Sequence, residues 1–422
     1  KKKLLYQVFV VIMMATFLVT GCGQSGNDSK ASKSSQRSEV KASDKEKVDA
    51  PEIPELTFER AMDLTYAKEF DVYYYKDGYK LIDVHEDRQY LIVPEGKEAP
   101  EGLDEDIVVI KQPVQNIYMA ATATMSLFSR LDALDTISFS GLEASGWYVE
   151  NAKEAMESGE ITYAGKYSEP DYEKIVDGDC NLAIESTMIL HTPKVQEQIL
   201  DESCGLAIEN TMIYHTPEVK EQLESSGIPV FVDYSSYEAH PLGRTEWIKL
   251  YGAMLNKEDL AESFFEDQAK VIEELKDFKN TEKTVAYFYM NSDGSVVVRK
   301  SDDYIPSMIE IAGGRYIFTD LKNADSNAPS VKLTMEEFYA TAVDTDYLIY
   351  NGTIDGQVSS IADLESKSDL FAEFKAVKDG NVWYTGKNLY QATDTVGELI
   401  GDIHHMLTDG DASQMTFLEK MN

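Results

Sequence analysis

The sequence predicts an α/β fold with two lobes, each built on a mainly parallel sheet, and a long helical segment between them. Short apolar runs, typical of buried strands, alternate with helical patterns along most of the chain. This alternation is typical of parallel sheets that carry helices on both faces. It stops near residue 243, gives way to a helical stretch, and restarts after Phe278.

The first lobe is expected to span residues 51–243. Its predicted strands are 107–110, 136–139, 182–184, 206–208 and 228–232. Helical patterns follow in the polar segments between them, for example at 125–131 and 216–223. The stretch 51–106 matches no pattern that we can name, and we interpret it as a small strand-rich addition to this lobe.

The connector is expected to be helical from residue 244 to 278. Residues 244–255 place apolar side chains at helical spacing, and Asn256 is expected to cap a second helix that has Asp259 at its third position. A helix of about 20 residues spans roughly 30 Å, which is enough to brace two lobes.

The second lobe is expected to span residues 279–422, with strands at 284–288, 347–350 and 381–384 and a helix at 395–407. Ligands of open α/β sheets bind outside the carboxyl ends of the strands. Two Rossmann-like lobes joined by a long interdomain helix are therefore expected to enclose a ligand cleft.

The N-terminus combines a cationic segment with a short apolar stretch. Lys1–Lys3 precede the almost continuously apolar run 4–19, a pattern typical of a secretory signal. The run ends in Leu18-Val19-Thr20-Gly21-Cys22, which resembles the bacterial lipobox, whose cysteine receives a lipid. We expect residues 1–21 to be a lipoprotein signal peptide and Cys22 to carry the anchor. A buried cysteine beside a signal anchor is the alternative.

Residues 22–50 are rich in Ser, Lys, Asp, Gly and Gln and contain almost no large apolar side chain. Such a segment buries too little surface to offset the entropy of ordering, so we expect a disordered tether. A lipid followed by a tether places the body at the extracellular face of the cell membrane, anchored without spanning it.

The charge of the chain limits its partners. The formal net charge is −36, which argues against nucleic acid and against an anionic membrane surface as the main partner. The chain has 3 cysteines, one of them Cys22, so disulfides are not expected to form its framework. Whether Cys180 and Cys204 pair stays open.

Three motifs give the chain a specific resemblance. The stretches EAHPLGRTEWI (238–248), DYEKIV (171–176) and KLTMEEFY (332–339) resemble motifs of the substrate-binding proteins of ABC importers for iron-siderophores and cobalamin. The resemblance covers about residues 100–420. It implies two lobes around a ligand cleft and delivery of the ligand to ABC permease subunits.

The resemblance also implies how the permease is contacted. In that family an exposed glutamate on each lobe docks into arginine pockets of the permease. The matching positions are Glu173 and Glu336, with Glu337 as the less favoured register. The alternative is that both are solvated carboxylates at helix starts, where negative charge is favourable in any case.

An internal repeat with a period of 24 residues occupies 180–227. Residues 180–193 return as 204–217 with few changes, and each copy reads as a strand, a polar loop and a helix. A tandem duplication explains the pattern, and the sheet must then gain a strand or exclude one copy. Because the second copy leads directly into the strand at 228–232, we favour it at the cleft. The alternative is that its Met212 packs beneath the lobe.

The ligand candidates lie in loops after predicted strands. Aromatic side chains provide flat apolar walls, and arginine provides a charge suited to an anionic chelate. The candidates are Tyr118, Met119, Trp147, Tyr148, Glu209, Thr211, Met212, Tyr237 and Arg244 in the first lobe and Arg299, Tyr304, Asn351 and Tyr390 in the second. Loop aromatics that pack at lobe edges, and an Arg244–Glu246 ion pair at a helix start, are the alternatives.

We therefore expect a monomeric, lipid-anchored solute-binding protein without enzymatic activity, cofactor or bare-metal site. It captures a ferric siderophore and hands it to the permease subunits of an ABC importer. Haem and cobalamin are the alternatives in the same class. A surface enzyme or an adhesin is the alternative from another class, although the chain lacks the common hydrolase, zinc-protease and nucleotide-binding motifs.

Overall fold

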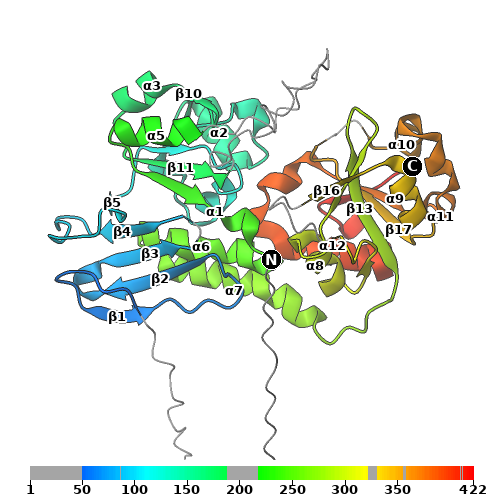
Figure 1. Cartoon of the computed structure of the whole chain (residues 1–422), viewed down its shortest axis with the longest axis horizontal. Helices are drawn as coiled ribbons and strands as arrows, with labels where there is room; N and C mark the ends of the chain where they lie inside the picture. Colours follow the sequence, from blue (N-terminus) through cyan, green and yellow to red (C-terminus); the bar gives the residue numbers. More distant parts are fainter. Residues whose placement is uncertain are drawn as a thin grey trace, which may run out of the picture. The chain divides into compact units, whose positions relative to one another are not determined.

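The computed structural model describes residues 50–85, 87–187, 217–321, 330–354, 358–408, 410 and 412–422. The expected signal peptide, the lipid site Cys22 and all but the last residue of the expected tether lie outside the described residues. Within these ranges the chain forms α/β structure around three principal sheets (Figure 1). This confirms the predicted fold class.

The N-terminal part of the first lobe forms a five-stranded sheet of its own, in the order β1-β2-β3-β4-β5. One face packs on the main core through Val72, Ile82 and Ile92, and the other buries a small cluster around Leu81 and Leu91. Its strands are β1 (Phe58–Ala61), β2 (Phe70–Tyr75), β3 (Lys80–Val84), β4 (Gln89–Val93) and β5 (Val108–Lys111). The sequence correctly indicated strands here, but it placed the strand at 107–110 in the lobe's parallel sheet.

The first lobe contains an all-parallel sheet in the order β12-β11-β6-β7-β8. Its apolar strands are buried on both faces, as the continuous apolar runs predicted. The strands are β6 (Ile117–Met119), β7 (Ile137–Ser140), β8 (Thr162–Tyr163), β11 (Leu182–Ser186) and β12 (Val230–Asp233). The accompanying helices are α1 (Met125–Arg130), α2 (Glu150–Ser158), α3 (Tyr172–Asp177) and α5 (Pro217–Ser225).

The repeat contributes one strand and one helix to this lobe, each from a different copy. The strand β11 belongs to the first copy, whereas the helix α5 belongs to the second. The expected strand at 182–184 is therefore confirmed, whereas the expectation that the second copy adjoins the cleft is not tested. Residues 188–216, which include most of the second copy, lie outside the described residues.

The connector consists of two packed helices, α6 (Pro241–Leu255) and α7 (Glu258–Leu275). The expectation that Asn256 caps the start of α7 is wrong, because Lys257 occupies that position. Asn256 ends α6 in the left-handed conformation, with φ 58° and ψ 41°, which asparagine tolerates better than most residues. The close approach of Gly252 to Ala261, where an added Cβ would lie 2.6 Å from the alanine Cβ, brings the helices together.

The second lobe has a seven-stranded mixed sheet in the order β16-β14-β13-β17-β18-β19, with β15 also pairing with β13. Its strands are β13 (Thr284–Met290), β14 (Val296–Arg299), β15 (Arg315–Tyr316), β16 (Ser330–Leu333), β17 (Tyr347–Tyr350), β18 (Val382–Thr385) and β19 (Leu418–Lys420). Its helices are α8 (Tyr304–Ile311), α9 (Met335–Ala342), α10 (Ile361–Lys367), α11 (Lys375–Lys378) and α12 (Val396–Thr408).

The helix α7 joins the hydrophobic cores of the two lobes. Phe265 belongs to the core of the first lobe, Leu275 packs on that of the second, and Ile272 contacts both. In Figure 1, α6 and α7 lie beside β1–β4 and extend toward α8 and α12. A helix packed on both cores limits the range over which the lobes can move apart.

Candidate functional site

The two lobes meet at loops that leave the carboxyl ends of their parallel strands. In the first lobe this is the segment 141–149 after β7, and in the second lobe it is the segment 386–395 after β18. This is the edge of an open α/β sheet at which ligands bind. Two sets of side chains from both lobes meet at this junction.

The first set comprises Arg244, Arg299 and Tyr304. The guanidinium carbon of Arg244 lies 4.2 Å from the ring centroid of Tyr304, and that of Arg299 lies 5.3 Å from the same centroid. Arg299 donates two hydrogen bonds, of 2.8 and 2.7 Å, to the Asp303 carboxylate. The charge of Arg299 is thus balanced within its own lobe.

Arg244 has no such carboxylate partner among the described residues. Its Nε is buried and has no hydrogen-bond partner in the part of the chain that the structure describes. All other residues of α6 except Leu255 are buried. The buried Thr245 hydroxyl donates to the carbonyl oxygen of Thr393 in the second lobe at 2.9 Å, and Arg244 is the partly exposed polar side chain that α6 presents to that lobe. A partly exposed guanidinium over an aromatic ring is suited to an anionic group.

The second set comprises Tyr148, Tyr390 and Gln391. The rings of Tyr148 and Tyr390 come from different lobes and meet edge to face, with centroids 6.3 Å apart. Gln391 accepts a hydrogen bond of 2.7 Å from the backbone N–H of Tyr148 and donates one of 2.8 Å to the carbonyl oxygen of Gly146. Both tyrosines remain exposed, by 45% and 39%, so they offer aromatic surface to a ligand.

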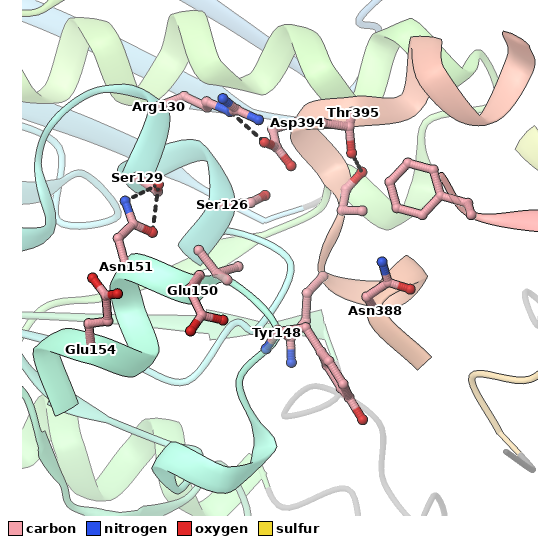
Figure 2. Close-up of a pocket in the computed structure, with 14 residues that line it drawn as sticks. Ser126, Ser129, Arg130, Tyr148, Glu150, Asn151, Glu154, Asn388, Asp394 and Thr395 are labelled. Carbon is pink, nitrogen blue, oxygen red and sulfur yellow. Dashed lines mark hydrogen bonds and ion pairs between the residues drawn. The ribbon is translucent and has the colours of Figure 1, made fainter. Parts of the chain in front are cut away.

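A groove of about 460 Å³ lies beside this second set. Figure 2 shows Ser129, Glu150 and Asn151 on one side of it and Asn388 and Asp394 on the other. The Nε of Arg130 on α1 donates to the Asp394 carboxylate at 2.6 Å and so links the lobes at one end of the groove. The volume lies in the range usual for small-molecule sites.

Two buried glutamates fix the start of α6 and therefore the position of Arg244. Glu246 accepts hydrogen bonds from the backbone N–H groups of Thr65, Tyr66 and Ala67, at 2.9, 2.7 and 2.8 Å. Its carboxylate also lies 3.2 Å from the Nζ of Lys249. The expected alternative of an Arg244–Glu246 ion pair is thus wrong, because Glu246 is fully buried against the segment before β2.

Glu238 is likewise a buried acceptor for backbone N–H groups, those of the two residues that follow Ala67. It accepts from the backbone N–H groups of Lys68 and Glu69, at 2.9 and 3.1 Å, and from the Nε1 of Trp247 at 3.0 Å. The ring of His240 stacks on Tyr66 with centroids 4.4 Å apart. The motif 238–248 therefore ties the N-terminal sheet to the helix that carries Arg244.

Four of the sequence-predicted ligand residues belong to the protein interior. Tyr118 and Met119 are fully buried in β6, and Trp147 is buried and donates to the Ser140 hydroxyl at 3.1 Å. Asn351 is buried, and its Oδ1 accepts from the backbone N–H and the hydroxyl of Thr353. These four side chains therefore do not provide open surface at the cleft. Tyr118 and Met119 were misplaced because β6 was taken for a loop.

The remaining predicted residues fall into two groups. Tyr148, Arg244, Arg299, Tyr304 and Tyr390 lie at the junction of the lobes, and Tyr237 is half-buried with its ring 5.5 Å from that of Tyr234. Glu209, Thr211 and Met212 lie outside the described residues. The sequence-based prediction of the ligand site missed Gln391 and Asp394. The one sequence signal for Gln391 is its position directly after Tyr390 in the loop that follows β18.

Glu185, at the carboxyl end of β11, is a buried carboxyl group without a hydrogen-bond partner in the described ranges. Burial raises the pKa of Glu185 well above its ordinary value. Within those same ranges no group of three or more His, Cys, Asp and Glu side chains is arranged to hold a metal ion. The described side chains at the lobe junction include arginines, aromatic rings, amides and the carboxylates of Asp303 and Asp394.

A protein-family model and curated relatives match a large part of the chain. The family model described as "Periplasmic binding protein" matches residues 141–389, which include the loops of both lobes. The curated relatives include the uncharacterized lipoproteins MJ0878, 24% identical over 69% of this chain, and MJ0872, 30% identical over 45% of it, both from Methanocaldococcus jannaschii. The chain spans 64% and 50% of the lengths of these two relatives.

Solved structures show the same fold. The periplasmic heme binding protein HutB of Vibrio cholerae aligns with a TM-score of 0.51 and 16% identity, over 68% of this chain and 98% of that one. A protein of an ABC-type Fe3+-hydroxamate transport system from Saccharomonospora viridis aligns with a TM-score of 0.50 and 17% identity, over 70% and 94%. In the described part of our chain, no helix is both long and apolar enough to cross a bilayer. The chain belongs to the periplasmic binding protein family.

Proposed function

We propose that this protein is the extracytoplasmic solute-binding component of an ABC importer and that it captures an anionic chelate, with a ferric siderophore as the leading candidate. The observation that carries the proposal is Arg244, a guanidinium that has no carboxylate partner among the described residues and lies over Tyr304 of the opposite lobe, in a chain of net charge −36. Structural neighbours named for heme and for Fe3+-hydroxamate transport support a chelate as the cargo class.

Capture would use groups from both lobes. Arg244 would neutralise an anionic group of the chelate, and the exposed rings of Tyr148 and Tyr390 would cover its apolar faces. Arg299 is held by Asp303, so it would support Tyr304 and would not bind the ligand directly. Because α7 packs on both cores, we infer a modest closure of the lobes upon binding.

Titration of the intrinsic tryptophan fluorescence of the full chain with ferric siderophores, haem, cobalamin and free metal ions tests this proposal. Trp147 adjoins Tyr148, so a bound chromophoric ligand is expected to quench it. Saturable quenching by a ferric siderophore at micromolar concentration or below is the expected result. Saturation by haem or cobalamin alone would replace the siderophore by that cargo, and no saturation by any of them would contradict the proposal.

We further propose that Glu173 and Glu336 contact the permease. Both are exposed in the first turns of α3 and α9. Glu337 accepts hydrogen bonds from the backbone N–H and hydroxyl of Thr334 in a capping box, which favours Glu336 as the docking residue. Replacing Glu173 and Glu336 with alanine is expected to abolish uptake while ligand affinity is retained. Glu157→Ala, at an exposed position of α2, is the control, and unchanged uptake in the double variant would contradict the role.

Attachment through Cys22 is part of the same proposal. The signal-like segment ends at this cysteine, and two relatives carry the name lipoprotein. Membrane fractionation of the wild type and of Cys22→Ala tests it. The wild type should sediment with membranes and the variant should not; equal sedimentation of both would contradict lipid attachment at this position.

A further inference from the structure

The segment 390–394 of the second lobe is hydrogen-bonded to the first lobe. Gln391 is 1% exposed and uses both ends of its amide: its Oε1 accepts from the N–H of Tyr148 at 2.7 Å, and its Nε2 donates to the carbonyl oxygen of Gly146 at 2.8 Å. Both partners are backbone groups of the segment 141–149, which follows β7. Because both ends of this buried amide are bonded, it holds the two segments at a fixed distance.

Two further residues of the same segment extend the contact to the helices α6 and α1. The carbonyl oxygen of Thr393 accepts from the buried hydroxyl group of Thr245 on α6 at 2.9 Å. The carboxylate of Asp394 accepts from the Nε of Arg130 at the end of α1 at 2.6 Å, and the side chain of Asp394 is only 10% exposed. A short, charge-assisted contact of this kind is stronger than a hydrogen bond between neutral groups. The segment thus contacts three elements that do not belong to its own lobe.

The segment is attached to its own lobe at both ends. Leu389 before it and Val396 after it pack on the core of the second lobe. The side chains of Gln391 and Asp394 lie between these two points and are bonded to the first lobe instead. Buried polar groups are favourable only while their partners are in place. If the lobes moved apart here, both side chains would lose their partners, so these contacts favour the closed arrangement.

We propose that Gln391 and Asp394 form a clasp that holds the two lobes together in the absence of a ligand. The groove of about 460 Å³ is lined by both of these residues and by their partners Tyr148 and Arg130. Figure 2 shows Arg130 and Asp394 paired at one end of the groove. Because the walls of the groove come from different lobes, the clasp makes the groove a permanent feature of the ligand-free protein.

A clasped junction affects ligand binding, and this consequence rests on the proposed function. A ligand that meets a preformed groove does not have to select a rarely populated closed state, so less of its interaction energy is lost. The closure that remains on binding is then small. A chain without the clasp would have to close around its ligand, and its affinity would fall in proportion to the fraction of molecules that are closed. The clasp itself does not depend on the cargo and can be tested without one.

Pulsed EPR distance measurements on the ligand-free full chain test the clasp. The three cysteines are replaced by alanine, and spin labels are attached to Glu157→Cys in α2 and Ala362→Cys in α10, which are exposed positions of the two lobes. The parent is expected to give one narrow distance maximum. With Gln391→Ala and Asp394→Ala combined, a second maximum at longer distance should appear, because an open arrangement becomes populated once the closed one loses these contacts.

Two variants control this result. Asn388→Ala removes an amide that lines the same groove but makes no hydrogen bond to the first lobe among the described residues, so it should give the parent's distribution. Arg130→Ala breaks the ion pair from the other side and should produce a smaller population of the longer distance. The Arg130 side chain is 46% exposed, so this variant should fold even if the double variant does not. Adding Asp394→Ala to Arg130→Ala should change the distribution no further, because both remove the same contact.

Three results would overturn the proposal. A broad distribution in the parent would show that the lobes are not held together without a ligand. A single narrow maximum in both the double variant and Arg130→Ala would show that α6 and α7 fix the lobes by themselves. A longer maximum in Asn388→Ala as large as that in the double variant would show that packing of the loop, and not the clasp, is responsible. None of these results depends on which ligand the protein binds.

Discussion

Replacing Glu246 with alanine is expected to lower the free energy of unfolding by about 3–5 kcal/mol. The carboxylate is fully buried and accepts hydrogen bonds from three consecutive backbone N–H groups, at residues 65–67. Its removal leaves these donors without an acceptor and takes the buried carboxylate partner away from Lys249, whose side chain is almost completely buried. Equilibrium denaturation by urea, compared with the wild type, measures the change.

Glu262→Ala is the matched control for this prediction. Glu262 is the other carboxylate of Lys249, at 3.0 Å, but its side chain is 51% exposed. Solvent screens that pair, so its loss should cost less than about 1 kcal/mol. Equal effects of the two alanine variants would show that Glu246 acts only as a counter-ion and that it does not anchor the N-terminal sheet to α6.

Replacing Arg244 with alanine is expected to weaken ligand binding by about 100-fold without unfolding the protein. Loss of one partner of a desolvated charge pair typically costs 2–5 kcal/mol, and each 1.4 kcal/mol corresponds to tenfold in affinity. Arg244 stacks on Tyr304 and has no carboxylate partner among the described residues, so the fold loses little when its charge is removed. Fluorescence titration with the cargo identified by the ligand panel measures the loss.

Two further variants distinguish charge from shape at this position. Arg244→Lys keeps the positive charge but loses the planar, stacked guanidinium, so an intermediate loss of affinity is expected. Arg315→Ala is the control, because Arg315 is exposed and pairs with Glu282 in the second lobe at 3.2 Å. An Arg244→Ala variant that binds as tightly as Arg315→Ala would remove Arg244 from the ligand site.

The fold could be predicted where the signal is local. The apolar runs at 182–184, 284–288 and 347–350 form buried strands as expected, since continuous apolar runs of this length occur in sheets covered on both faces. The helix predicted at 395–407 appears as α12, Val396–Thr408. In each case the residues that define the element are also those that it buries.

The prediction failed where distant partners decide the structure. The strand predicted at 107–110 pairs with β4 in the N-terminal sheet and does not belong to the parallel sheet of the first lobe. Because that strand was assigned to the parallel sheet, the true strand β6 was taken for the loop that follows it, and Tyr118 and Met119 were expected at the cleft. The acceptor role of Glu246 depends on backbone amides 179–181 residues away in the chain. No residue spacing in the sequence encodes such contacts.

The two repeat copies are difficult to distinguish from the sequence for a similar reason. The second copy was favoured at the cleft because it adjoins the following strand; β11 comes from the first copy, and residues 188–216 lie outside the described residues. Identical apolar residues cannot distinguish the copies, whereas Lys220 and Glu224 can, through Asp87 and Arg88 in the N-terminal sheet. The informative residues thus lie in the helix, and their partners are visible only in three dimensions.

Hydrogen–deuterium exchange of the full chain, with and without the cargo that saturates the fluorescence signal, tests the central claim most directly. If the ligand is held between the lobes, backbone amides should become protected in segments 141–149 and 234–244 of the first lobe and also in 299–304 and 386–392 of the second. Protection confined to one lobe, or to the N-terminal sheet of β1–β5, would contradict a binding site formed by both lobes.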